Sequence, residues 1–260
     1  MIFAKKSLGQ NFLIDKNIVR KIINLVKIKG NHVIEIGPGK GALTDEILKQ
    51  KPKSLLLIEK DFKLMEKLKI KHSNNNIIKI VNSDVLKYNF EEIKNKNLII
   101  FGNLPYNISS QILVKMIKFN KWPPNYKHLI FMFQKELGDK ITSIFPSSNY
   151  GRLSILSNYR LNILKKFLVS PNCFFPKPKV TSMVIHFNPK KEKLNIRHLK
   201  NLEKVTNILF SNKRKMINKN LKKIIPVEKI QHISDLKVNL RPADLKPEIY
   251  YKIANLIEEK

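Results

Sequence analysis

Short runs of continuous apolar residues alternate with stretches of helical spacing over most of this chain. An uninterrupted apolar run of about four to eight residues predicts a buried strand, and apolar residues at intervals of about three and four predict an amphipathic helix. Repeated strand–helix units with fully apolar strands indicate a mostly parallel sheet covered on both faces. The runs that predict strands are 32–36, 54–58, 77–81, 98–101, 128–133 and 180–187.

The helical stretches fill the intervals between these runs. Residues 16–27 have apolar side chains at helical spacing, and Asp15 stands where a helix N-cap is expected. Further helices are predicted from about Ala42, over 62–68 and from Ser109. The first part of the chain therefore has the pattern of an α/β domain.

The pattern changes after Asn188-Pro189. From there to Lys260 no strand pattern occurs, and only helical periodicity remains. We therefore expect two domains, an α/β domain over 1–188 and a small all-helical domain over 189–260.

The apolar run Leu98–Phe101 ends in a group of residues suited to bind a planar amine. Asn103, Leu104, Pro105 and Tyr106 follow it after a glycine. Ligands of open α/β sheets bind just outside the carboxyl ends of the strands. An Asn carbonyl can accept the hydrogens of an exocyclic amine, and a Tyr ring can stack on a base. The same residues are also common in ordinary strand-to-helix turns.

A second group of residues predicts a cofactor site. Gly37 and Gly39 lie in the turn after the first predicted strand, where glycine lets the backbone approach a ligand closely. This turn differs from the dinucleotide fingerprint, and alone it is only a tight turn. Glu59 and Asp84 end the next two strands, where carboxylates suit ribose hydroxyls and an adenine amine. The pattern favours a nucleoside-bearing cofactor without a pyrophosphate, hence S-adenosylmethionine over NAD.

Composition bears on the partner. The 260 residues include 50 Lys and Arg against 20 Asp and Glu, a formal charge of +30 that favours a polyanion. Only six of the basic residues are Arg, so we attribute part of the excess to compositional drift in an AT-rich genome. Residues 190–223 hold twelve basic and two acidic side chains, whereas 224–260 hold six of each. The concentrated stretch predicts a phosphate-binding surface, with a solvated helical face as the alternative.

Several features predict a cytoplasmic protein. The single cysteine, Cys173, excludes an internal disulfide and favours a reducing compartment. No apolar run approaches the roughly 20 residues of a membrane span. The first residues lack the apolar segment of a signal peptide.

The motifs together resemble the ribosomal RNA adenine N6-dimethyltransferase family, over nearly the whole chain. The resemblance implies a Rossmann-like class I S-adenosylmethionine methyltransferase sheet. It implies that the segment Asn103–Tyr106 holds the target adenine and that Phe174 stacks on its other face, although Phe174 suits loop packing equally well. The residues implied as cofactor contacts are Asn11, Leu13, Gly37, Gly39, Glu59, Asp84 and Asn103. The motifs that carry the resemblance are 6–13, 35–41, Glu59, Asp84, 103–106, 133–136, 150–154 and 174–180.

The C-terminal motifs 210–215 and 241–245 resemble the small-subunit branch of this family. That branch dimethylates two adjacent adenines near the 3′ end of small-subunit (16S) rRNA. The chain departs from the family at Gly138-Asp139-Lys140 and by having Lys in place of Arg beside Arg214, which loses bidentate geometry towards phosphate. The expected RNA-binding residues are Lys213, Arg214, Lys215, Lys219 and Lys222.

The expected partner is small-subunit rRNA or the immature small subunit, bound by a monomer without a metal or a membrane. Three alternatives remain open. The first is a large-subunit rRNA methyltransferase of the antibiotic-resistance type. The second is an RNA-binding assembly factor in which methylation is secondary or lost. The third is a DNA adenine methyltransferase, which would not account for the C-terminal motifs.

Overall fold

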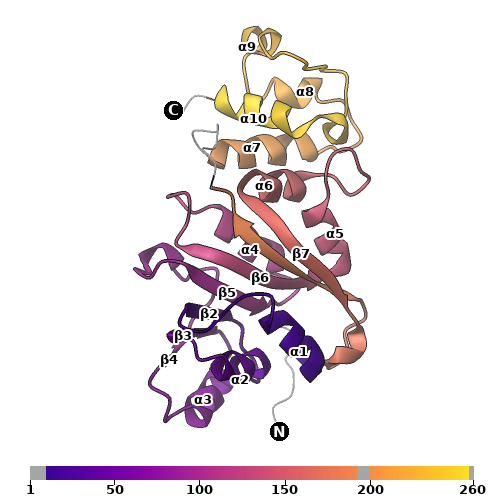
Figure 1. Ribbon diagram of the computed structural model, residues 1–260. Coiled ribbons are helices and arrows are strands. Elements are labelled where there is room, and N and C mark those ends of the chain that lie inside the picture. The colour runs from indigo at the N-terminus through magenta and orange to yellow at the C-terminus, as the bar shows by residue number, and fades with distance from the viewer. Residues whose placement is uncertain (1–9, 192–198, 258–260) are drawn as a thin grey trace. The chain divides into compact units, whose positions relative to one another are not determined.

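A computed structural model describes residues 10–191 and 199–257 (Figure 1). Contacts between Cα atoms divide the chain into two compact units. The first contains the described residues up to Gly138 and the segment Asn162–Lys190, and the second contains Asp139–Leu161, Lys191 and the described residues from Leu199. This division differs from the two expected contiguous domains, 1–188 and 189–260, because residues 139–161 group with the C-terminal segment.

The first unit is built on a sheet of seven strands in the order β4-β3-β2-β5-β6-β9-β7. The pairs β4/β3, β3/β2, β2/β5 and β5/β6 are parallel, and β6/β9 is antiparallel. The predicted, mostly parallel sheet is therefore confirmed. The strands are β2 (His32–Ile36), β3 (Ser54–Glu59), β4 (Ile78–Asn82), β5 (Leu98–Asn103), β6 (Tyr126–Gln134), β7 (Leu161–Val169) and β9 (Ser182–Pro189).

The chain changes direction across the sheet between β2 and β5. Strands β3 and β4 extend from one side of β2, and β5 then pairs with its other side, with Ile36 opposite Gly102. The carboxyl ends of β2, β3 and β5 consequently open onto the same edge of the sheet, which is where open α/β sheets bind ligands.

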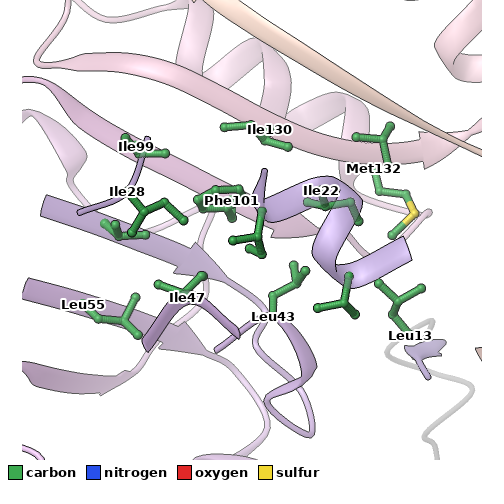
Figure 2. Packing of buried hydrophobic residues seen from close by; sticks show 14 of the residues in the cluster. Leu13, Ile22, Ile28, Leu43, Ile47, Leu55, Ile99, Phe101, Ile130 and Met132 are labelled. Carbon is green, nitrogen blue, oxygen red and sulfur yellow. The ribbon is translucent and has the colours of Figure 1, made fainter. Parts of the chain in front are cut away.

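Both faces of the central strands β2 and β5 are buried, as their continuous apolar runs predict. Val33 belongs to the core cluster on one face. Phe101 and Ile22, which lies in helix α1 (Lys16–Ile23), belong to the same cluster (Figure 2). Side chains alternate across a strand, so Ile34 and Ile100 point to the opposite face, and these are buried as well.

The described residues of the first unit form the helices α1 (Lys16–Ile23), α2 (Ala42–Lys49), α3 (Phe62–Lys71) and α4 (Ser109–Ile117) and the start of α5 (Lys135–Thr142). Asp15 caps α1 by accepting hydrogen bonds from the backbone N–H groups of Asn17 and Ile18 at 2.8 and 3.0 Å, which confirms the predicted N-cap. The helix ends at Ile23, four residues before the predicted end at Lys27. Short 3-10 helices, η2 (Phe90–Glu92) and η3 (Pro171–Cys173), lie in the connections.

A separate two-stranded ribbon joins distant segments of the first unit. Strand β1 (Phe12–Leu13) pairs antiparallel with β8 (Phe174–Phe175), with Phe12 opposite Phe175 and Leu13 opposite Phe174. The apolar pattern of the sequence predicts neither this ribbon nor the edge strand β7.

The second unit is helical in its described residues. Phe210 and Tyr250 stack with ring centroids 5.7 Å apart, and Arg152 forms an ion pair with Glu203 at 3.2 Å. No helix among residues 10–191 and 199–257 is long and apolar enough to cross a membrane. The helices are the end of α5 (Lys135–Thr142), α6 (Arg152–Arg160), α7 (Leu199–Phe210), α8 (Asn218–Leu221), α9 (Val227–Gln231), η4 (Pro242–Asp244) and α10 (Pro247–Asn255).

Candidate active site

A cavity opens at the carboxyl edge of the sheet, where β2, β3, β4 and β5 end. Every residue predicted to contact the cofactor or the target adenine lines it, with the exception of Phe174. The predicted residues that line it are Asn11, Leu13, Gly37, Gly39, Glu59, Asp84, Asn103, Leu104, Pro105 and Tyr106. The structure therefore brings together residues that lie up to about 95 positions apart in the chain.

The turn after β2 depends on glycine. Gly37, Gly39 and Gly41 have φ angles of 65°, 59° and 85°, a region that other residues rarely adopt. A Cβ atom on Gly39 would also lie 3.0 Å from Cδ1 of Phe12. The absence of side chains therefore lets the turn close against β1 and form one wall of the cavity.

Glu59, at the end of β3, is fixed by the backbone around it. Its Oε2 accepts a hydrogen bond from the Gly39 N–H at 3.1 Å, and its Oε1 accepts one from the Asp61 N–H at 2.8 Å. The side chain is buried, and desolvation raises its pKa even though both hydrogen bonds favour the charged form. A carboxylate offers about four acceptor positions, so further positions remain for hydroxyl donors in the cavity.

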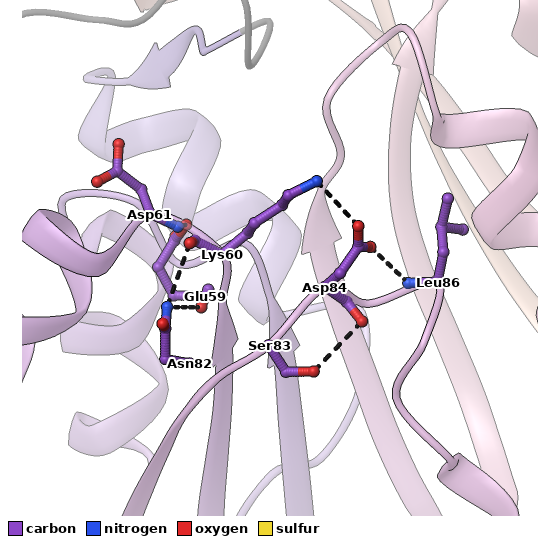
Figure 3. A network of polar contacts seen from close by, with 7 residues as sticks. All are labelled: Glu59, Lys60, Asp61, Asn82, Ser83, Asp84 and Leu86. Carbon is purple, nitrogen blue, oxygen red and sulfur yellow. Dashed lines mark hydrogen bonds and ion pairs between the residues drawn. The ribbon is translucent and has the colours of Figure 1, made fainter.

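Asp84 lies beyond β4 and pairs with a lysine. Its Oδ2 is 2.9 Å from Nζ of Lys60, and its Oδ1 accepts a hydrogen bond from the Leu86 N–H at 2.9 Å (Figure 3). The hydrogen bond from Lys60 is the main reason why the pKa of Asp84 is lowered. Asp84 is therefore a preformed anion at the rim of the cavity.

Glu35 is a further carboxylate in the cavity wall, and its position in the sequence predicts no separate role for it. It is only 1% exposed, and Thr44 donates a hydrogen bond from Oγ1 to its Oε2 at 2.6 Å. Burial raises its pKa to about 8. The group therefore changes charge in the neutral to weakly basic range.

Asn103 ends β5 with a fixed amide orientation. Its Nδ2 donates a hydrogen bond to the backbone carbonyl of Asn11 at 2.9 Å. Rotating the amide by half a turn would set two acceptors against each other, so the nitrogen stays on the Asn11 side. Among the described residues none donates a hydrogen bond to Oδ1 of Asn103, and Asn103 lines the cavity.

Tyr106 is held from the far end of its ring. Its hydroxyl lies 2.6 Å from Oγ of Ser182, a buried residue at the start of β9, and burial raises the pKa of the phenol. Leu104 is buried against Gly102, where a Cβ would approach Cδ2 of Leu104 to 2.5 Å. The backbone from Gly102 to Tyr106 is therefore anchored on both sides of Asn103.

Phe174 is not among the residues that line the cavity, and its expected stacking role stays a prediction. Its ring is 3% exposed and packs in the core cluster with Leu13, its partner across the ribbon. Directly opposite residues of an antiparallel pair lie on the same side of the ribbon, and the next pair lies on the other side. The loop-packing alternative thus agrees with the structure for Phe174, and the neighbouring ring, Phe175, is the exposed one.

Other cavity residues were not singled out from the sequence. Phe12 and Lys60 line the cavity, and so does Gln10, which donates from Nε2 to Asp61 at 3.2 Å. Gln10 and Phe12 lie within the motif that carried the family resemblance, and Lys60 directly follows Glu59. Their positions in or next to these motifs indicate that they lie near the site, but their roles depend on contacts between distant segments.

The expected RNA-binding residues all belong to the second unit. Residues 213–215 follow α7, and two further lysines lie in or next to α8. All five side chains are exposed: Lys213, Arg214, Lys215, Lys219 and Lys222. Exposure is compatible with phosphate binding, and their role stays a prediction. In residues 10–191 and 199–257 no cluster of three or more His, Cys, Asp or Glu side chains is arranged to hold a metal ion.

The order of the strands, the glycine turn after β2 and the acids after β3 and β4 define a class I S-adenosylmethionine-dependent methyltransferase. Within this class, the family model described as ribosomal RNA adenine dimethylase matches residues 2–259. The chain belongs to this family. It is therefore an enzyme, an rRNA adenine dimethyltransferase with S-adenosylmethionine as its cofactor.

Individual relatives agree with this assignment. The chain is 45% identical to the ribosomal RNA small subunit methyltransferase A of Pelagibacter ubique, over 98% of this chain and 97% of that protein. It is 41% identical to the protein of the same name from Malacoplasma penetrans, over 96% and 91% of the two chains. Among solved structures, a dimethyladenosine transferase from Plasmodium falciparum superposes with a TM-score of 0.76 at 25% identity, covering 93% of this chain and 95% of that one.

Proposed function

We propose that this enzyme dimethylates N6 of two adjacent adenines near the 3′ end of small-subunit (16S) rRNA during assembly of the small ribosomal subunit. The names of the relatives and the resemblance of residues 210–215 and 241–245 to the small-subunit branch support this substrate. The observation that carries the chemistry is the fixed amide of Asn103, which leaves an acceptor in the cavity.

The cavity residues fit S-adenosylmethionine, which supplies an activated methyl group and its own leaving group when bound. Glu59 would accept hydrogen bonds from the ribose hydroxyls, and Asp84 would accept one from the adenine amine. Gly37 and Gly39 would let the backbone approach the cofactor, and Asn11 and Leu13 would close the site from the β1 side. The fit is supported by Glu59, a buried carboxylate with acceptor positions left over at the cavity wall.

Asn103 and Leu104 would orient the target amine. The lone pair of an adenine amine is delocalised into the ring, which makes the nitrogen a poor nucleophile. Acceptors at Oδ1 of Asn103 and at the Leu104 carbonyl would hold the two amine hydrogens and favour a pyramidal nitrogen with its lone pair directed at the methyl group. The protein thereby contributes orientation. No dedicated general base is needed, since the alkylated amine is acidic enough to lose its proton to water.

The target base must leave its helix or come from a single-stranded loop to reach this cavity. Tyr106, held by Ser182, would provide one stacking face for the base. A second methylation requires the monomethylated amine to turn beside Asn103, so the cavity must have room there. Lys213, Arg214 and Lys215 would bind RNA phosphates, with specificity coming from the shape of the RNA.

The transfer of a tritiated methyl group tests this proposal. Unmethylated small subunits, large subunits, naked small-subunit RNA and DNA are each incubated with the enzyme and labelled S-adenosylmethionine. We expect label in small-subunit RNA, recovered as N6,N6-dimethyladenosine at two neighbouring positions. Label in large-subunit RNA or in DNA would contradict the proposed substrate. Tight binding to small subunits without transfer would favour the assembly-factor alternative.

We also propose that the enzyme acts as a monomer in the cytoplasm. Ten of the residues predicted to bind the cofactor or the target adenine line one cavity of this chain, which supports a site that a single copy can form. The oligomeric state is checked by light scattering with and without RNA. A dimer that is required for methyl transfer would contradict this part of the proposal.

A further inference from the structure

The pairing of β1 with β8 places the adjacent residues Phe174 and Phe175 on opposite sides of the ribbon. Leu13 and Phe174 form one cross-strand pair and are buried in the core, whereas Phe12 and Phe175 form the next pair. Phe12 lines the catalytic cavity. Since paired side chains share a side of the ribbon, Phe175 lies on the same side as the cavity residue Phe12.

Phe175 presents its ring to solvent. It is 62% exposed, whereas Phe12 beside it is 6% exposed. A lysine accompanies both rings, because Nζ of Lys40 lies 4.7 Å from the centroid of Phe12 and 5.8 Å from that of Phe175. Lys40 is itself part of the glycine turn and lines the cavity. An exposed aromatic ring therefore lies beside a lysine that lines the cavity.

The charged side chains in the segment of the chain that contains Phe175 are all basic. The segment Asn162–Lys190, which includes Phe175, contains five lysines and no Asp or Glu. Lys177 and Lys179 lie two and four positions after Phe175 in the chain, and both are exposed. Asp15, which contacts Cys173 in this region, uses its carboxylate to cap α1. The surroundings of Phe175 consequently favour an anionic partner.

We propose that Phe175 and Lys40 form a subsite for a single-stranded RNA nucleotide next to the target adenine. The neighbouring base stacks on the exposed ring of Phe175, and Lys40 binds a backbone phosphate between that base and the target. Stacking on an aromatic ring beside a basic group is the usual way in which proteins hold single-stranded nucleic acid. The inference rests on the proposed function, because it requires RNA in the cavity.

Two observations distinguish this position from an incidental exposed side chain. Single exposed hydrophobic residues are normal on protein surfaces, and Phe62 of α3 is one, with 61% of its area exposed. Phe62 does not line the cavity. Phe175, in contrast, is the cross-strand partner of the cavity residue Phe12 and shares the cation of Lys40 with it. Phe62 therefore serves as a matched control of equal chemistry and exposure.

Steady-state methyl transfer to small-subunit RNA gives the first test. Phe175→Ala should raise the KM for RNA by about tenfold, within the range expected for one lost base–aromatic stack, with the KM for S-adenosylmethionine unchanged. Phe175→Trp should restore the RNA KM, and Phe62→Ala should leave both constants as in the wild type. Lys40→Gln should lower the slope of log KM against log salt by about 0.7, the value for one phosphate contact to a single strand.

Fluorescence gives a second test that needs no turnover. A short single-stranded RNA should quench the added indole of Phe175→Trp and not that of Phe62→Trp, and an abasic oligonucleotide of equal length should quench neither. An RNA KM unchanged in Phe175→Ala, or an indole insensitive to bound RNA, would overturn the subsite. A wild type that transfers no methyl group to RNA contradicts the proposed function instead, and the fluorescence result then decides the subsite alone.

Discussion

Nδ2 of Asn103 donates a hydrogen bond to the backbone carbonyl of Asn11, and the two atoms are 2.9 Å apart. This contact joins residues 92 positions apart and ties the N-terminal segment to the end of β5. It also determines which end of the amide faces the cavity. Asn11 is therefore a positioning residue for Asn103, through its backbone, in addition to its place in the cavity wall.

Replacing the amide by a carboxylate tests this orientation. Asn103→Asp removes the donor and sets two oxygens against each other, so we expect the carboxylate to turn away and kcat to fall by about 10²–10³-fold. Methyl transfer at saturating RNA and cofactor measures the effect. Asn76→Asp makes the same chemical change at an exposed position and should leave kcat unchanged. An Asn103→Asp enzyme with near-normal kcat would show that the Asn11 contact is incidental.

The closeness of Gly39 to Phe12 predicts that a side chain at position 39 weakens cofactor binding in addition to straining the backbone. Gly30 and Gly39 both have positive φ angles, 73° and 59°, but only Gly39 has Phe12 within reach of a Cβ atom. Both alanine variants should lose about 1 kcal/mol of unfolding free energy from backbone strain. Gly39→Ala should in addition weaken S-adenosylmethionine binding, as measured by calorimetry. Equal cofactor affinity in the two variants would contradict a close approach at Gly39.

Glu35 predicts a dependence of stability on pH. Its pKa is about 8 in the folded protein against an ordinary value of 4.5, so the folded state holds a proton that the unfolded state releases between these pH values. Stability should therefore fall as pH rises through this window. The Glu35→Gln variant cannot ionise at this position. Its free energy of unfolding, relative to that of the wild type, should therefore rise by on the order of 1–3 kcal/mol from pH 5 to pH 9. Urea unfolding at both pH values measures the difference.

The control for this titration is Glu66→Gln, which changes an exposed carboxylate of α3. It should shift stability by the same small amount at both pH values. If the Glu35→Gln and wild-type curves stay parallel from pH 5 to pH 9, the protonated state of Glu35 in the folded protein is contradicted.

The basic residues after α7 predict a salt effect. The triple substitution of Lys213, Arg214 and Lys215 by Gln should reduce the slope of log affinity against log salt concentration. The expected reduction is about 0.7–0.9 for each phosphate contact that is lost. Replacing Lys237 and Lys246, which lie in the charge-balanced stretch 224–260, should leave the slope unchanged. Filter binding of small-subunit RNA at several salt concentrations gives both slopes. Equal slopes for the two variants would favour a merely solvated helical face.

Local chemistry was predictable from the sequence because it depends on neighbours in the chain. Asp15 caps the helix that follows it. Glu59 and Asp84 come after two apolar runs that predicted strands, and both line the cavity. Edge strand β7 was missed because its middle residues are polar and exposed, so it lacks the apolar run of a central strand.

Positions set by distant contacts were not predictable in the same way. Phe174 and Phe175 are chemically identical, and only the pairing of β8 with β1 decides which ring is buried. The orientation of the Asn103 amide likewise depends on a backbone carbonyl in another segment. Residues 139–161 group with the C-terminal segment through contacts that no local pattern reveals.

The proposed function requires that Asn103 orients the target amine more than it binds the cofactor. Wild type and Asn103→Ala are compared by methyl transfer to small-subunit RNA and by calorimetric binding of S-adenosylmethionine. We predict that transfer falls by about 10²–10³-fold while the cofactor Kd rises only a few-fold. A loss of cofactor affinity equal to the loss of transfer would contradict the claim and make Asn103 a binding residue only.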